Sequence, residues 1–249
     1  MRIRAAVAAL VLALTASACS NIGGTFFRQY EYDEEVYLSL DGRATVYVNA
    51  SIPALNALRG TAFDASPNAA VDRAAIRQLF TTPVTRVSGA VNTSRRANRR
   101  FVHVKLDVDD IRQLNRAGPF AWSTYNFTRD GDLYRYLQVV GPAAGKDVGS
   151  VGWNGRELVA FRLHLPSRIQ YHNNGRPVDR GNILVWEQPL SERVRGATLT
   201  LDARMDTQSI LYTTLWLFGW TFLAVAIMFV LVIWWVFRRA PAAAPRAAH

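Results

Sequence analysis

Apolar and polar positions alternate along much of the chain between residues 31 and 203, and this alternation predicts short β-strands. Valine, leucine and alanine take every second position in residues 36–40 and 46–50, with Asp41-Gly42 between the two runs. Because a glycine supplies the positive φ of a tight turn, residues 31–52 are predicted to form a β-hairpin. The same alternation predicts strands at residues 84–91, 101–108, 122–128, 133–140, 158–165, 168–172, 183–186 and 197–203.

Short helices interrupt these strands. Residues 53–58 begin with proline and end before Gly60, as short helices often do. A second helix is predicted from Ser66-Pro67 to residue 79, and Asp109 can cap a third at residues 111–114. Turns are predicted at Asp130-Gly131 and Asn174-Gly175, and a glycine-rich loop at residues 141–155. The expected fold class is α+β: a strand-rich external domain with antiparallel hairpins and a few short helices, because regular βαβ units are missing from the pattern.

The C-terminal pattern is different, because residues 210–237 contain no charged side chain over 28 positions. About 20 apolar residues span the hydrocarbon core of a bilayer, so one transmembrane helix is predicted at residues 209–237. Aromatic residues mark both of its ends, as they do at membrane interfaces: Tyr212, Trp216, Trp220, Trp234 and Trp235. Arg238-Arg239 follow at once, and the positive-inside rule therefore places residues 238–249 in the cytoplasm and the preceding domain outside.

The N-terminus resembles a secretory signal, with two arginines before an apolar run at residues 5–16. Ala16-Ser17-Ala18 precede Cys19, the one cysteine in the sequence. This arrangement predicts a lipoprotein-type signal peptide at residues 1–18 and lipidation of Cys19 by fatty acids such as palmitate. Ala16 stands where such signals usually have leucine, and cleavage by an ordinary signal peptidase remains the alternative.

Between the predicted signal peptide and the predicted transmembrane helix, the mature chain consists of a tether at residues 19–30 and an external domain at residues 31–204. The whole chain has 29 basic and 19 acidic residues, but five arginines lie in the two terminal segments. Residues 19–208 therefore keep 29 − 5 = 24 basic against 19 acidic side chains, a net charge of +5. This moderate charge suits an anionic membrane surface and gives no reason to expect nucleic acid as a partner.

No motif for catalysis, a cofactor or a metal is visible in the sequence. It lacks Gly-x-Ser-x-Gly, His-Glu-x-x-His, a phosphate-binding loop and paired cysteines. His103 is expected to face solvent. His164 and His172 lie on strands predicted to be adjacent, where they are either ordinary polar residues or metal ligands with Glu157 or Asp179. The expectation is a protein that is not an enzyme and needs no cofactor or metal.

Two features suit surface binding. Four arginines, Arg95, Arg96, Arg99 and Arg100, lie within residues 94–100 at a predicted turn, where they can bind anionic lipid headgroups. The alternative is a solvated turn. Nine aromatic residues line either a lipid-sized cavity or an ordinary core: Tyr30, Tyr32, Trp122, Tyr125, Phe127, Tyr134, Tyr136, Trp153 and Trp186.

Residues 16–19, the hairpin at residues 32–48 and the terminal helix closed by Arg238-Arg239 together resemble the LppM-type envelope lipoprotein domain family of bacteria. The resemblance implies an α+β, lipid-binding-like domain at the cell surface, without established catalytic residues. The leading hypothesis is a doubly anchored cell-membrane lipoprotein whose external domain binds membrane lipid or glycolipid. The alternatives are a protein-interaction module of an envelope complex, with an envelope protein as partner, and an envelope hydrolase.

Overall fold

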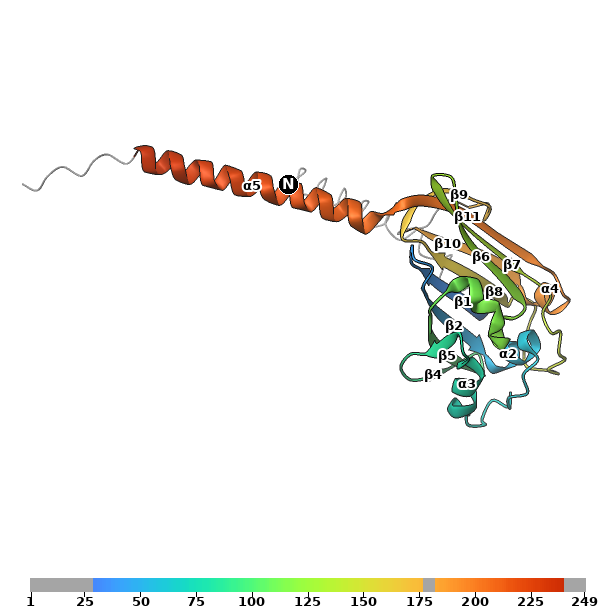
Figure 1. Ribbon diagram of the computed structural model, residues 1–249. Coiled ribbons are helices and arrows are strands. Elements are labelled where there is room, and N and C mark those ends of the chain that lie inside the picture. Colours follow the sequence, from blue (N-terminus) through green and yellow to red (C-terminus); the bar gives the residue numbers. More distant parts are fainter. Residues whose placement is uncertain (1–28, 177–181, 240–249) are drawn as a thin grey trace, which may run out of the picture.

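Two β-sheets and one long C-terminal helix dominate the described part of the chain, residues 29–176 and 182–239 of a computed structural model (Figure 1). The larger, seven-stranded sheet has the order β10 (Ile183–Pro189), β8 (Leu158–His164), β1 (Tyr30–Leu38), β2 (Ala44–Ser51), β5 (Arg99–Val108) and β3 (Thr85–Val87), and β4 (Asn92–Arg96) also pairs with β5. The smaller, four-stranded sheet has the order β6 (Ser123–Asp130), β7 (Leu133–Val140), β11 (Leu199–Ser209) and β9 (Ser167–His172). The predicted α+β class is confirmed.

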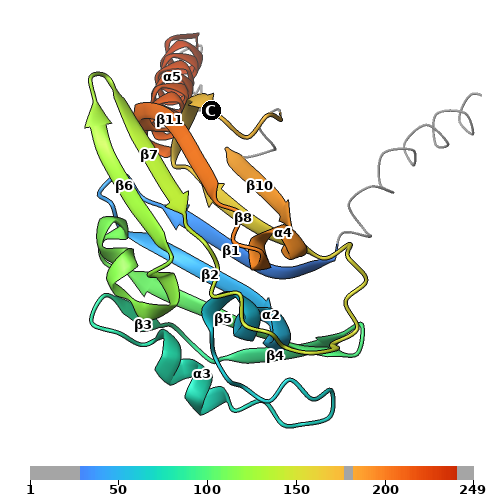
Figure 2. The same ribbon diagram turned by 90° about the vertical axis from the view of Figure 1, so that its right-hand side faces the viewer.

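Short helices lie around these sheets. They are α2 (Ile52–Arg59), α3 (Arg73–Phe80) and α4 (Leu190–Val194), with the 3-10 turns η1 (Ile111–Arg116) and η2 (Gly118–Phe120). Figure 2 shows α3 along the β3–β4 edge of the larger sheet and the smaller sheet on the other side of the core. Among the described strands, the β1–β8 pair is parallel and the other pairs are antiparallel.

The first predicted hairpin is confirmed. β1 and β2 pair in the register Leu38↔Ala44, and Gly42 has the expected positive φ of 89°. The adjoining helix α2 also agrees with its prediction, because Ser51 caps its first turn and Gly60, with φ 71°, ends it.

Among the boundaries that differ from the sequence prediction, three have a clear local cause. α3 begins only at Arg73, because Asp72 caps the helix by accepting from the Ala75 N–H at 2.9 Å. The strand expected at residues 84–91 ends at Val87, since Gly89 has a φ of 76° that breaks the extended chain. Asp110, rather than Asp109, caps the third short helix, as its side chain accepts from the Arg112 N–H.

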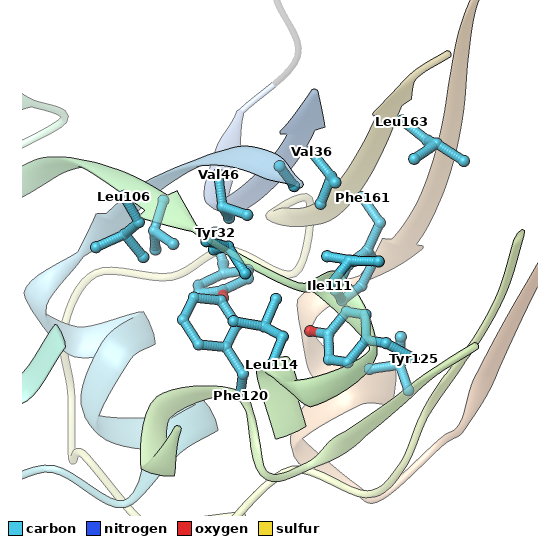
Figure 3. Close-up of a cluster of buried hydrophobic side chains, with 14 of the residues drawn as sticks. Tyr32, Val36, Val46, Leu106, Ile111, Leu114, Phe120, Tyr125, Phe161 and Leu163 are labelled. Carbon is cyan, nitrogen blue, oxygen red and sulfur yellow. The ribbon is translucent and has the colours of Figure 1, made fainter. Parts of the chain in front are cut away.

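A shared hydrophobic core fills the space between the sheets (Figure 3). It contains Tyr32, Tyr125, Phe127, Tyr136 and Trp186, each at most 5% exposed. These predicted aromatics are therefore core residues. Apart from the C-terminal helix, the exposed large hydrophobic residues of the described chain are Tyr37, Val139 and Tyr171.

The long helix α5 (Ile210–Arg239) follows β11 directly. The last strand, predicted to end at residue 203, continues to Ser209, and the Ile210 N–H donates to the Pro166 carbonyl at 3.0 Å. The segment of α5 that could cross a membrane, Ile210–Arg238, has 29 residues, and its most apolar 18-residue stretch has a mean hydropathy of 2.4 and is 0% buried. A helix so apolar and so uncovered fits membrane association, and its length of about 43 Å exceeds the hydrocarbon thickness.

Candidate functional site

The hairpin of β4 and β5 divides the four predicted arginines between two faces. Its two-residue turn is Ala97-Asn98, both with positive φ, and the strands pair as Arg95↔Arg100 and Arg96↔Arg99. Residues directly opposite each other in an antiparallel ladder point to the same face. The predicted turn is therefore present, but it carries two pairs of arginines rather than one cluster of four.

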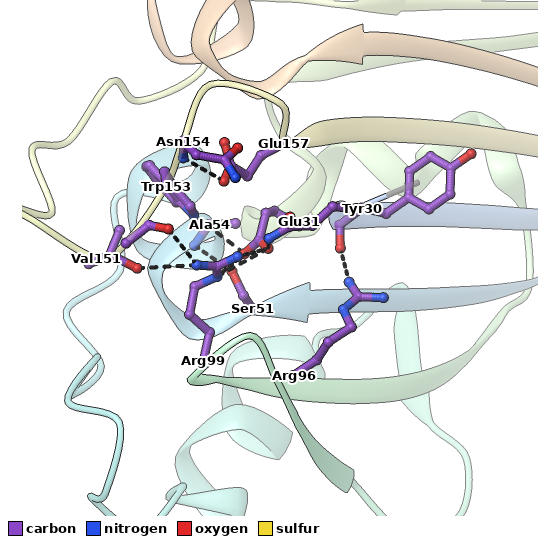
Figure 4. A network of polar contacts seen from close by, with 12 residues as sticks. Tyr30, Glu31, Ser51, Ala54, Arg96, Arg99, Val151, Trp153, Asn154 and Glu157 are labelled. Atoms are coloured by element: carbon purple, nitrogen blue, oxygen red, sulfur yellow. Dashed lines mark hydrogen bonds and ion pairs between the residues drawn. The ribbon is translucent and has the colours of Figure 1, made fainter. Parts of the chain in front are cut away.

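Arg99 is not available to a headgroup, so its predicted role is wrong. It is 4% exposed, and its guanidinium forms an ion pair with Glu31 at 2.9 Å (Figure 4). A second nitrogen, Nη1, donates to the carbonyls of Val151 and Gly152 at 3.4 and 2.9 Å. Arg99 thus fastens the loop of residues 141–157 to the sheet, and the Trp153 indole N–H also donates to Glu31 at 3.4 Å.

The other pair of arginines lines a basic pocket, which we define by Arg73, Arg95, Arg100, Asn68 and Thr93. This hollow has a volume of about 450 Å³, and residues 67–71 complete its wall. Arg73 reaches it from α3 and donates to the Thr93 hydroxyl at 3.1 Å. Arg95 donates to Asn68 Oδ1 at 3.3 Å. The lining contains three guanidinium groups and no carboxylate.

Arg100 is the least satisfied of these three side chains. Its Nη2 donates to the Asp64 carbonyl at 2.6 Å, whereas its buried Nε and Nη1 have no partner. A buried donor without an acceptor costs free energy, more so when it is charged. Ser66, through its side chain and its N–H, lowers the pKa of Asp64, and Arg100 contributes less to this shift.

The basic pocket has the chemistry of an anion site. A guanidinium presents its N–H groups in a planar fork that matches phosphate and carboxylate oxygens. Two forks and the free edge of Arg100 meet in a hollow large enough for a headgroup phosphate and its substituent. Sequence analysis missed Arg73, because it lies 22 residues before Arg95 and only the packing of α3 beside the hairpin brings them together.

A second polar cluster, which the sequence analysis missed, lies between the sheets around Glu34. Its carboxylate accepts from the Tyr125 hydroxyl at 3.0 Å, from Gln138 Nε2 at 3.1 Å and from Arg59 Nη2 at 3.2 Å. Burial, and then the charge of Glu34, raises the pKa of Tyr125, so this hydroxyl remains a donor. Glu34 occupies an inward position of β1 between Tyr32 and Val36. The alternation of side chains along this strand was therefore enough to predict that Glu34 is buried.

Trp122 borders this cluster and forms cation–π contacts with two arginines. The guanidinium carbons of Arg59 and Arg193 lie 3.4 and 4.7 Å from its ring centroid. Burial, and then the neighbouring Arg59, lowers the pKa of Arg193 to about 10, which leaves it charged at neutral pH. Arg193 donates to the carbonyls of Ala197 and Gly141, so it ties α4 and the following turn to the end of β7.

The histidines are placed differently from their predictions. His103 does not simply face solvent, because its ring is partly buried and is hydrogen-bonded to Asn49 and Ser94. His164 and His172 belong to β8 and β9, which lie in different sheets. His164 instead contacts Glu35 at 2.5 Å. Within residues 29–176 and 182–239, no three His, Cys, Asp or Glu side chains are grouped in a way that would hold a metal ion.

Cys19, the predicted lipidation site, lies outside the described residues. Comparison with known proteins finds no matching family model and no significant match among curated proteins. Among solved structures, this chain is similar to the NMR structure of the folded domain of LppM from Mycobacterium tuberculosis, with 14% sequence identity and a TM-score of 0.38. The similarity covers 74% of this chain and 94% of that domain. It is too distant to carry an argument about function.

Proposed function

We propose that this protein is a non-catalytic, membrane-anchored envelope protein whose external domain binds anionic lipid headgroups in the basic pocket. The observation that carries the proposal is Arg100, with two buried and unpartnered donors in a hollow that Arg73 and Arg95 also line. An anionic oxygen is the acceptor that these donors lack. Arg96 lies on the other face of the hairpin and is not part of this site.

The two ends of the chain support a location against the outer leaflet. Arg238 and Arg239 after the span favour a cytoplasmic C-terminus and an external domain. The guanidinium of Arg238 lies 4.4 Å from the Trp234 ring centroid, an arrangement typical of a membrane interface. Acylation of Cys19 would add a second anchor at the N-terminus.

Binding of a soluble anionic lipid to the full chain tests the basic pocket. The measurement is native mass spectrometry of the protein in a zwitterionic detergent, titrated with dihexanoyl phosphatidylglycerol or with the matching phosphatidylcholine. Each arginine near an anionic headgroup contributes about 1 kcal/mol. The combined change Arg73→Gln, Arg95→Gln and Arg100→Gln should therefore weaken phosphatidylglycerol binding on the order of 100-fold.

The matched control is the combined change Arg43→Gln, Arg86→Gln and Arg129→Gln, which removes the same charge from exposed positions elsewhere. It should leave the affinity within about threefold of the wild type, because surface charges far from the site are screened. Equal weakening by both triple variants, or equal binding of phosphatidylcholine and phosphatidylglycerol, would contradict the proposed site.

A further inference from the structure

A row of polar side chains crosses the outer face of the larger sheet, the face turned away from the core. Arg162 donates to Asp33 Oδ2 at 2.9 Å, and Asp33 and Asn49 are neighbours in the β1–β2 register. The next pair in the row is Asn49 and His103, whose Nδ1 lies 2.9 Å from Asn49 Oδ1. His103 Nε2 lies 2.7 Å from the Ser94 hydroxyl. One side chain each from β8, β1, β2, β5 and β4 thus forms a nearly continuous row.

The protonation state and the hydrogen bonds of His103 follow from its neighbours. Burial, and then the charge of Arg96, lowers the pKa of His103, so the ring is neutral at neutral pH. If the amide oxygen of Asn49 accepts from Nδ1, then Nε2 accepts from the Ser94 hydroxyl. Both ring nitrogens are therefore used, and His103 fixes the row in place rather than offering a free base.

A groove of about 290 Å³ lies over this row. Tyr30 and Phe101 contribute aromatic rings to its walls, and Arg96 and Arg162 contribute the cations. The guanidinium carbons of these arginines lie 4.5 Å from the Phe101 centroid and 4.9 Å from the Tyr30 centroid. The groove is on the opposite face of the β4–β5 hairpin from the basic pocket, and Ser94 is the one lining residue that the two hollows share.

Asp33 is the least satisfied member of the row. Its side chain is 9% exposed, and its Oδ1 is buried without a hydrogen-bond partner, although the residue lines the groove. Burial raises the pKa of Asp33 to about 6, against the opposing effects of Arg162 and of a hydrogen bond from the Asn49 side chain. The carboxylate is therefore costly to keep ionised at neutral pH, and a further donor from a ligand would stabilise it.

We propose that this groove binds a single sugar ring. The ligand must donate to Asp33 and accept from Arg96 and Arg162, which hydroxyl groups do in both directions. It must also fit beside the partly buried Tyr30, as the C–H face of a pyranose does, whereas Phe101 is 4% exposed and offers the ligand no surface. A simple anion has no donor for Asp33, and a simple cation is repelled by the two arginines. The volume is at the lower end of the range for small-molecule pockets, which suits one ring.

Saturation-transfer NMR on the full chain tests this site. The protein is held in a zwitterionic detergent without a sugar headgroup, and the probes are the methyl glycosides of glucose, mannose, galactose and N-acetylglucosamine. At least one glycoside should receive saturation from the protein. A glycosyl diacylglycerol in the micelle is the second arm, and it distinguishes a lipid-borne sugar from a soluble one. Transfer in either arm supports a sugar site.

Two variants locate the binding. Asp33→Ala removes the acceptor and should weaken the binding on the order of 10- to 100-fold, as expected for a hydrogen bond to a charged group. Asp33→Asn keeps the shape and an acceptor oxygen, and should weaken it about tenfold or less. The control is Lys105→Ala on the same face, because Lys105 does not line the groove, and it should bind as the wild type does.

The folded state of each variant is checked by cooperative thermal unfolding, and if Asp33→Ala does not fold, the result for Asp33→Asn decides. No transfer to any glycoside or glycosyl lipid from the folded wild type would overturn the proposal. Transfer that is unchanged in both Asp33 variants would also overturn it. Neither result bears on phosphatidylglycerol binding in the basic pocket, so the two sites can fail separately.

Discussion

Glu31→Gln removes the carboxylate that pairs with Arg99 and leaves the guanidinium buried. Both side chains are at most 4% exposed, so water cannot replace the lost partner. Breaking a buried ion pair by removing one member costs about 3–5 kcal/mol. The glutamine oxygen can still accept one hydrogen bond, and we therefore expect the lower end, about 3 kcal/mol of unfolding free energy.

The double change Glu31→Leu and Arg99→Met should be less harmful than Glu31→Gln alone. It leaves no buried charge, and apolar replacement of an ion pair is often close to neutral. The carbonyls of Val151 and Gly152 lose their donor, which costs about 1–2 kcal/mol. The double variant should thus be about 1–2 kcal/mol less stable than the wild type, and the single variant about 3.

Urea unfolding of the full chain in detergent, followed by far-ultraviolet circular dichroism, gives these free energies. Trypsin gives a second readout, because Lys146 and Arg156 lie in the loop that Arg99 fastens. Cleavage there should be faster in Glu31→Gln than in the wild type. A double variant less stable than the single one, or a single variant within about 0.5 kcal/mol of the wild type, would refute the reasoning from buried charge.

Three further predictions concern stability and anchoring. Gly141→Ala should cost about 1–3 kcal/mol in urea unfolding, because the new Cβ would lie 2.8 Å from the Trp122 carbonyl oxygen, whereas Gly118→Ala meets nothing within 4 Å and should change little. The pKa of Asp33 is about 6 in the folded state and 3.8 in its ordinary range, so the folded state binds this proton more tightly. Lowering the pH from 7 to 4 should therefore stabilise the wild type relative to Asp33→Asn by up to about 3 kcal/mol. A stability difference between the two proteins that does not change with pH would contradict the raised pKa. Cys19→Ala should abolish labelling by a fatty-acid analogue while α5 keeps the protein in the membrane fraction, and persistent labelling would remove the lipoprotein hypothesis.

Local features were predictable from the sequence because they depend on neighbours along the chain. The hairpin at Asp41-Gly42 and the ends of α2 follow from residues within a few positions of each turn or cap. The division of the arginines was also within reach, since a two-residue turn at Ala97-Asn98 fixes which side chains share a face. Taking residues 94–100 as one turn concealed this alternation.

Long-range placements could not be predicted in the same way. The parallel pairing of β1 with β8 joins Tyr30 to Leu158, and nothing in either strand specifies the other. His164 and His172 are eight residues apart, yet the chain changes sheets between them near Pro166. Alternation alone shows which residues share a face of one strand, but it does not assign that strand to a sheet.

The buried aromatic residues exclude the space between the sheets as the place for the proposed lipid binding. Tyr125 and Tyr136 fill the space between the sheets, and their hydroxyls are held by Glu34 and Gln138. A lipid chain placed there would have to break these buried hydrogen bonds, each worth about 1 kcal/mol or more. Binding at the surface avoids that cost, and the described hollows at the β4–β5 hairpin are of this kind.

The first described residues, 29 and 30, lie beside the same hairpin. Arg96 donates to the carbonyl of Tyr30, the first residue of β1, so the chain that leads back to Cys19 leaves the domain there. Ten residues reach at most about 35 Å. At the other end β11 enters α5 without a spacer, and Figure 1 shows α3 and β4 to the side of the helix axis. A lipid at Cys19 would therefore limit how far the hairpin can tilt away from the leaflet. Loss of Cys19 should then weaken headgroup contact without changing either site.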